Sequence, residues 1–307
     1  MEFTHLYNTA SGPAITDCCF IGQRYEKTKP FSPYASESWV LRNYLDPKSK
    51  QLICRLTYGV AGYFTMLWRA PSGTVYVAEA DNRVHISSRP EEFKSWRQTE
   101  VPAFLRGIWG LDDSCVFAWG VRDRVQRLLR WNGSTWTELS APGEIVRMHG
   151  TSPDFMFAVG AKGLLARWNG QNWQQVPIRT NETLTGVFIA GPNEYYACGE
   201  GGTLLSGTAH GWRERATAPG PLHDVAVFAG SVWVAAGDAG LMRLKGTSNE
   251  LEAVKPNVKA LCFDVRGQLL ITCSEELVGS SDGVSFGGCC EGALERYTAN
   301  RKPLWQQ

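Results

Sequence analysis

The chain has 307 residues, of which 43% are hydrophobic and 20% are charged, and its formal net charge is +1. This balance is typical of a globular protein and excludes a disordered chain. The sequence has no long run of one sign, which argues against a nucleic-acid binder, because such proteins carry a basic stripe that neutralises phosphates.

Neither a leader nor a membrane span is apparent in the sequence. The first 16 residues lack a positive segment followed by an apolar core, and no stretch approaches the roughly 18 apolar residues that a membrane-spanning helix needs. We therefore expect a cytoplasmic protein that does not contact a membrane. The nine cysteines show no Cys-x-x-Cys or zinc-type spacing, so we expect reduced thiols, with no metal and no cofactor.

The N-terminal region holds three strand candidates, at residues 15–22, 39–45 and 51–57. Residues 23–38 between the first two are rich in Pro, Ser and charge and predict a long loop. These strands would need a contribution from residues 294–305 to complete a four-stranded sheet. The sequence thus predicts a blade built from both chain ends.

An internal repeat of roughly 40 residues fills the region from about residue 60 to residue 290. Arg130-Trp131-Asn132-Gly133-Ser134-Thr135-Trp136 recurs as Arg167-Trp168-Asn169-Gly170-Gln171-Asn172-Trp173, an offset of 37 residues. The last position of this motif recurs in register as an aromatic or apolar residue, at Trp96, Trp136, Trp173, Trp212, Leu251 and Phe286.

Each repeat divides into four short strands separated by turns, as in residues 184–189, 195–198, 203–206 and 212–216. Such a sheet cannot bury both faces alone, but a ring of them can. The sequence therefore predicts an all-β fold, a single β-propeller domain over residues 1–307. We expect seven blades rather than six, at about 15–57 with the C-terminus, 58–102, 103–143, 144–181, 182–220, 221–257 and 258–293.

One hairpin resembles a known family. Ser280-Ser281-Asp282-Gly283-Val284-Ser285-Phe286 is similar to the Asp-box turn of sialidase-like and photosystem-assembly-factor-like propellers. That turn implies a fold but no activity. In its small size, diverged repeats and lack of a signal, the chain also resembles the propellers that serve as immunity proteins beside bacterial contact-dependent and type VI toxins.

We found no set of residues suited to catalysis. The Arg-Ile-Pro motif of sialidases, phosphate loops and the Gly-x-Ser-x-Gly elbow are all missing. His149 and His223 could approach each other across the ring, but a solvated or core role is favoured for both. Tyr63, Trp68 and Trp109 lie in or beside innermost strands and either line the channel or pack between blades, of which packing is favoured.

We expect a partner to bind on one rim of the propeller, formed by the loops between blades and the loops between second and third strands. The charges there have both signs, which suits a protein partner. We expect the blade-to-blade loops to carry Arg147 and Asp224 as well, and we expect the segment from Val121 to Arg124 to be a longer loop. The predicted rim residues are Asp81, Arg83, Arg106, Arg122, Asp123, Arg124, Glu144, Lys162, Glu200, His223, Asp238 and Glu275.

These observations predict a non-catalytic protein that recognises another protein. The sharpest form of the hypothesis is an immunity protein that inhibits a cognate bacterial toxin acting in the cytoplasm, for example a nuclease. Two alternatives stay open, namely an assembly or scaffold propeller of the photosystem-assembly type and a glycan-binding, sialidase-like propeller.

Overall fold

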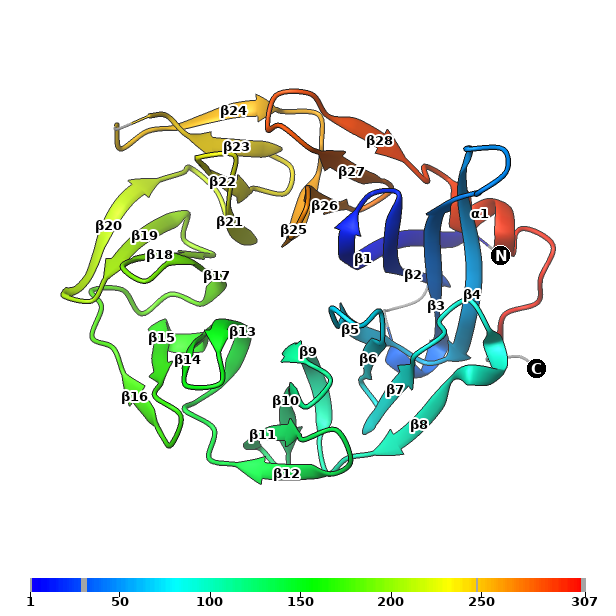
Figure 1. The fold of residues 1–307 in the computed structure, drawn as a ribbon, viewed down its shortest axis with the longest axis horizontal. Helices are drawn as coiled ribbons and strands as arrows, with labels where there is room; N and C mark the ends of the chain where they lie inside the picture. Colours follow the sequence, from blue (N-terminus) through cyan, green and yellow to red (C-terminus); the bar gives the residue numbers. More distant parts are fainter. Residues whose placement is uncertain (1, 29–31, 247, 305–307) are drawn as a thin grey trace.

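The computed structural model describes residues 2–28, 32–246 and 248–304, and it forms a ring of seven four-stranded antiparallel sheets (Figure 1). Each sheet is one blade whose strands run in chain order from the centre of the ring to its outside. The prediction of a seven-bladed propeller is therefore confirmed.

The first three blades occupy the N-terminal half. Blade 1 comprises β1 (Phe3–Ala14), β2 (Asp17–Glu26), β3 (Ser36–Leu45) and β4 (Leu52–Ala61). Blade 2 comprises β5 (Phe64–Arg69), β6 (Val75–Glu79), β7 (Arg83–Ser87) and β8 (Arg97–Glu100). Blade 3 comprises β9 (Phe104–Asp112), β10 (Cys115–Arg122), β11 (Val125–Trp131) and β12 (Trp136–Leu139).

The other four blades follow in the same pattern. Blade 4 comprises β13 (Ile145–Ser152), β14 (Phe155–Gly160), β15 (Leu164–Trp168) and β16 (Trp173–Gln175). Blade 5 comprises β17 (Leu184–Gly191), β18 (Glu194–Gly199), β19 (Thr203–Thr208) and β20 (Gly211–Thr217). Blade 6 comprises β21 (Asp224–Phe228), β22 (Ser231–Ala235), β23 (Leu241–Leu244) and β24 (Leu251–Lys255). Blade 7 comprises β25 (Ala260–Val265), β26 (Leu269–Cys273), β27 (Leu277–Ser280) and β28 (Gly287–Cys289). Three short 3-10 turns, η1 (Pro33–Ala35), η2 (Phe93–Ser95) and η3 (Ala161–Gly163), lie in loops.

The core lies between the blades, because each sheet buries both of its faces. Strand β10 shows how: Val116 and Ala118 pack toward blade 2, whereas Phe117 and Trp119 pack toward blade 4. Side chains alternate across a strand, so a continuous apolar run serves two interfaces at once. A buried cluster of this kind fills every interface of the ring.

The first blade differs from the prediction. Its innermost strand is β1, which the sequence analysis did not expect. Of the predicted loop at residues 23–38, residues 23–26 belong to β2 and residues 36–38 belong to β3, so the connection between these strands is shorter than expected. All four strands come from the N-terminal end, so the prediction that the C-terminus supplies a strand is wrong. The polar start of β1 hid its strand pattern, because its buried positions begin only at Tyr7.

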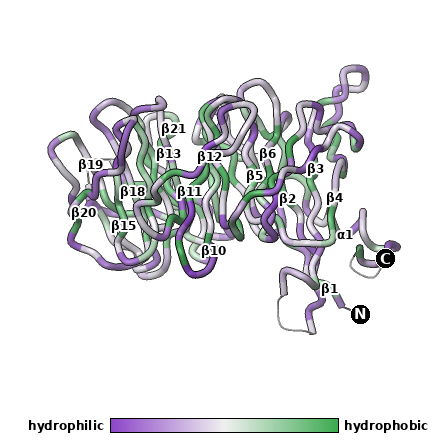
Figure 2. Tube along the Cα trace, turned by 90° about the horizontal axis from the view of Figure 1, so that it is seen from below, coloured by the Kyte–Doolittle hydropathy of each residue, from purple (hydrophilic) through white to green (hydrophobic). Residues whose placement is uncertain are grey.

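The C-terminal segment instead forms a short helix, α1 (Ala293–Thr298), against the first blade. Leu294 is buried among the side chains of blades 1 and 7, and the backbone carbonyl of Thr298 accepts a hydrogen bond from Arg24 at 2.9 Å. The two termini consequently lie near each other at blade 1 (Figures 1 and 2). Trp305, at the end of the predicted contribution, lies outside the described residues.

Candidate functional site

The two kinds of loop that form the predicted rim meet on one face of the ring. Backbone hydrogen bonds join the loop between a second and third strand to the connection that follows its blade. Val101 N–H donates to Asn82 at 2.9 Å, and Gly237 N–H donates to Ala260 at 3.0 Å. The two kinds of loop are therefore in direct contact at these blades, and the role of the rim in binding stays a prediction.

The rim residues are accessible to a partner. Several form ion pairs with one another or with neighbours: Arg106 with Glu144, Arg83 with Asp81 at 3.2 Å, and Asp238 with Lys259 at 3.0 Å. The half-exposed members are Asp81, Arg83, Glu144 and His223, and the exposed ones are Arg106, Arg122, Asp123, Arg124, Lys162, Glu200, Asp238 and Glu275.

The segment from Val121 to Arg124 is a tight hairpin rather than the longer loop that we expected. Strands β10 and β11 extend to Arg122 and from Val125, so only Asp123 and Arg124 form the turn. Both have a positive φ, of 51° and 62°, as in the two-residue turns that suit the twist of a hairpin. Strands β10 and β11 are longer than the corresponding strands β14 and β15 of the next blade, and the charged turn lies at their end.

An apolar pocket of about 290 Å³ opens beside the rim residues of blades 2 and 3. Asp81, Arg83 and Arg106 lie among its lining residues, together with the exposed rings of Tyr34 and Phe104. A pocket with aromatic walls and a charged margin has the features of a site that anchors one side chain of a partner.

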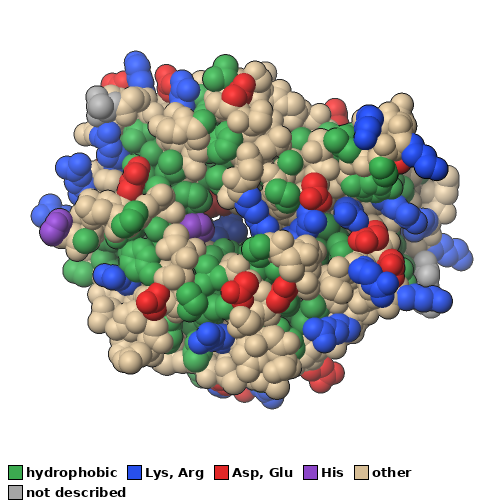
Figure 3. Space-filling model, in the orientation of Figure 1, with side chains coloured by type: hydrophobic (Ala, Val, Ile, Leu, Met, Phe, Trp, Pro, Cys, Tyr) green, Lys and Arg blue, Asp and Glu red, His purple; other side chains and the backbone are tan. Residues whose placement is uncertain are grey.

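A second cavity, of about 330 Å³, occupies the centre of the ring and is lined by residues of all seven innermost strands. The space-filling view shows the ring hollowed at its centre, with basic side chains and a histidine around the opening (Figure 3). Trp68 and Trp109 line this cavity and also contact buried inter-blade clusters, so both of the roles considered for them occur. Tyr63 lines the rim pocket instead.

Arg147 and Asp224 lie in this cavity and not in the blade-to-blade loops where we placed them. They belong to β13 and β21, and their side chains meet across the channel with Arg147 Nη2 3.4 Å from Asp224 Oδ2. Both carboxylate oxygens of Asp224 also accept backbone hydrogen bonds, from Val225 and Phe263, each at 3.0 Å. Burial raises the pKa of Asp224, while Arg147 and these N–H groups act in the opposite direction.

His149 contributes a neutral ring to the cavity. Its Nδ1 accepts a hydrogen bond from the backbone N–H of Ile189 at 3.1 Å, which places the ring proton on Nε2. Burial lowers the pKa of His149 to about 4. Its ring stacks on Phe188 with a centroid separation of 4.5 Å.

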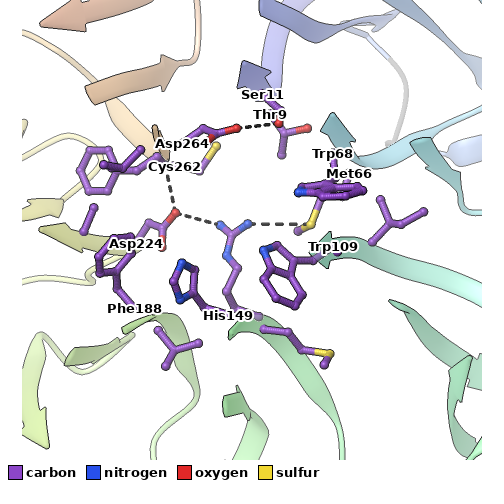
Figure 4. Close-up of a pocket in the computed structure, with 18 of the residues that line it drawn as sticks. Thr9, Ser11, Met66, Trp68, Trp109, His149, Phe188, Asp224, Cys262 and Asp264 are labelled. Atoms are coloured by element: carbon purple, nitrogen blue, oxygen red, sulfur yellow. Dashed lines mark hydrogen bonds and ion pairs between the residues drawn. The ribbon is translucent and has the colours of Figure 1, made fainter. Parts of the chain in front are cut away.

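A hydrogen-bond network from blades 1 and 7 lines the other side of the cavity. Asp264 pairs with Arg266 at 3.1 Å and accepts a hydrogen bond from the hydroxyl of Ser11 at 2.6 Å. Figure 4 shows Asp264 and Ser11 across the pocket from the rings of Trp109 and His149.

His149 and His223, which we considered as a pair, do not both lie in the cavity. His149 lines the channel, whereas His223 lies beside Gly237 on the rim side of blade 6. Across the described ranges, no group of three His, Cys, Asp or Glu side chains is arranged to hold a metal ion. All nine cysteines are free thiols. In the same ranges, no helix is long and apolar enough to cross a membrane.

The fold places this chain among the seven-bladed β-propellers, and solved structures agree. The WD40 propeller domain of Doa1 has a TM-score of 0.71 at 10% identity and covers 91% of this chain and 93% of its own. The YCF48 protein bound to D1 peptide has a TM-score of 0.55 at 13% identity and covers 73% of this chain and 80% of its own. Identities this low show the shared fold alone.

One curated protein is related in sequence. The immune protein Tsi7 of Pseudomonas aeruginosa is 31% identical over 160 residues, covering 48% of this chain. The match spans about half of the relative's length, 51%. No family model matches the chain, so the resemblance of residues 280–286 to an Asp-box rests on that hairpin. There Asp282 accepts hydrogen bonds from the N–H groups of Val284 and Ser285, each at 2.8 Å.

Proposed function

We propose that this chain is an immunity protein, a non-catalytic propeller that binds and inhibits a cognate bacterial toxin. The observation that carries the proposal is the 31% identity to an immune protein over 160 residues. The propeller fold and the distant relationship to an immune protein are consistent with a function in binding rather than in catalysis. The toxin would act in the cytoplasm, for example as a nuclease delivered by a type VI system, and the chain would meet it there.

The toxin would bind to the rim. Its charges of both signs would set the orientation of the complex and its rate of formation, because complementary charges act mainly on encounter and register. The apolar pocket lined by Tyr34 and Phe104 would hold one side chain of the toxin, since buried anchors contribute most of the energy of such interfaces.

Co-expression with the toxin encoded beside this chain tests the proposal. The chain should restore growth of cells that produce the toxin and should form a stoichiometric complex with it. Wild-type protein that neither binds nor protects would overturn the function.

Charge reversal at the exposed hairpin, Arg122→Glu/Arg124→Glu, tests the rim separately. This variant should weaken the complex at least tenfold. The matched control is Lys48→Glu/Arg89→Glu, in loops between third and fourth strands on the opposite face, which should bind as the wild type does. Equal loss in both variants would rule out the rim as the binding face.

A further inference from the structure

The central cavity has an aromatic wall on one side. Trp68, Trp109, His149 and Phe188 come from four successive blades and follow one another around the channel (Figure 4). The ring of His149 lies 5.9 Å from Trp109 and 4.5 Å from Phe188. Blades 1 and 6 contribute small side chains there, among them Ser11 and Ala226, whereas blade 7 contributes Phe263 and Arg266.

The hydrogen-bond donors of Arg147 in this space make long or weak contacts with their acceptors. The guanidinium of Arg147 faces a carboxylate oxygen at 3.4 Å and the sulfur of Met66 at 3.8 Å, and its Nε has no partner among the described residues. Sulfur is a weak acceptor, and a buried donor without a partner is costly. The Nε2–H of His149 adds a second donor, because its Nδ1 is already engaged.

The acceptors in the cavity, by contrast, are already engaged. Asp224 accepts two backbone N–H groups and faces Arg147. Asp264 is held by Arg266, Ser11 and the N–H of Gly12. A ligand that brings acceptors would meet the weakly engaged donors of Arg147, whereas a ligand that brings a cation would have to displace existing bonds.

We propose that this cavity binds a small planar carboxylate, an aromatic acid whose carboxylate pairs with Arg147 and whose ring packs on the wall formed by Trp109, His149 and Phe188. Guanidinium and carboxylate form strong, directional hydrogen bonds. A volume of about 330 Å³ is at the small end of ligand sites and accepts one ring with its acid group. Gly186 leaves room for the Asp224 side chain, because a Cβ there would lie 2.9 Å from Asp224 Oδ1.

Isothermal titration calorimetry with benzoate tests the site directly. Wild-type protein should bind one equivalent of benzoate and should bind acetate, benzyl alcohol and benzylamine at least tenfold more weakly. Absence of saturable benzoate binding would overturn the proposal. Equal binding of benzylamine would overturn the anion preference, and equal binding of acetate would overturn the role of the rings.

Variants locate the ligand. Arg147→Gln should weaken benzoate binding by about 10- to 100-fold, since a hydrogen bond to a charged group is lost, whereas Arg106→Gln on the rim should leave it unchanged. If Arg147→Gln fails to fold, Phe188→Leu provides the second test, because it removes a ring and keeps an apolar side chain. Unchanged benzoate binding in either folded cavity variant would overturn the site. The measurement needs no toxin, so its result is independent of the proposed immunity function.

Discussion

Asp264 of the last blade accepts a hydrogen bond from the backbone N–H of Gly12 in the first blade, at 3.1 Å. The same arrangement recurs around the ring: an inward side chain accepts an N–H from the innermost strand of the following blade. The pairs are Thr9 with Leu67, Ser11 with Arg69, His149 with Ile189 and Asp224 with Phe263.

The reason lies in the edge of each sheet. The innermost strand has a sheet partner on one side alone, so N–H groups on its other side face the channel without a ladder partner. Polar side chains from the preceding blade satisfy them. The hydrogen bond between Asp264 and Gly12 joins blade 7 to blade 1. Neither of these blades contains a strand from the other end of the chain.

Removal of the Asp264 side chain should therefore loosen the closure of the ring. Asp264→Ala should lower the free energy of unfolding by about 2 kcal/mol, because Arg266 loses its partly buried carboxylate and the N–H of Gly12 loses its acceptor. Asp264→Asn keeps an acceptor and should lose about half as much. Urea unfolding followed by tryptophan fluorescence measures both.

The matched control for this prediction is Asp112→Ala, which removes an exposed turn carboxylate of a hairpin and should cost less than about 1 kcal/mol. An Asp264→Ala variant as stable as that control would show that the bond between blades 7 and 1 does not contribute to closure.

The pH dependence of stability should report on His149. Its pKa is lowered to about 4 in the folded protein, so between that pH and about 6.5 the unfolded chain binds the extra proton. Stability is thus lost as the pH falls through this window, by about 3 kcal/mol for this one group. Urea unfolding at a series of pH values from 7 to 4 measures the slope.

The variant His149→Asn separates this effect from other titrations. An asparagine carbonyl can still accept the Ile189 N–H but does not titrate in this range, so the slope should flatten. Burial also lowers the pKa of His5, and the slope that remains would include that group. A slope identical to that of the wild type would contradict the assignment to His149.

The sequence predicts the propeller fold, but it does not predict which side chains line the central cavity. The tryptophans at 136, 173 and 212 recur in register, and that regularity predicts the period and six of the blades. The seventh blade was predicted from the strand candidates at residues 15–57. The channel shows no such regularity: the position of Arg147 is taken by Gly186 in the next blade and by Asp224 in the one after. Side chains that line the central cavity do not pack in the interfaces between blades, so they need not follow the repeat. The prediction therefore placed Arg147 and Asp224 in loops.

Three strands of the first blade were predicted, but its packing against the C-terminal segment could not be, for a different reason. Its contacts with α1 depend on residues almost 300 positions apart, such as His5 and Thr298, whose side chains are 3.1 Å apart. A local pattern does not encode such a pairing. The rim, by contrast, follows from the topology, because loops of two kinds reach the same face of every blade.

Helix α1 should stabilise the ring through one buried side chain. Leu294 is 1% exposed and packs against Gly22, where a Cβ would lie 2.9 Å from its methyl group. Leu294→Ala should lower the free energy of unfolding by about 3 kcal/mol, because it leaves a cavity between blades 1 and 7. Glu295→Ala, an exposed position on the same helix, should change it by less than about 0.5 kcal/mol. Similar urea midpoints for both variants would show that the helix merely lies on the ring, and that blade 7 meets blade 1 without its support.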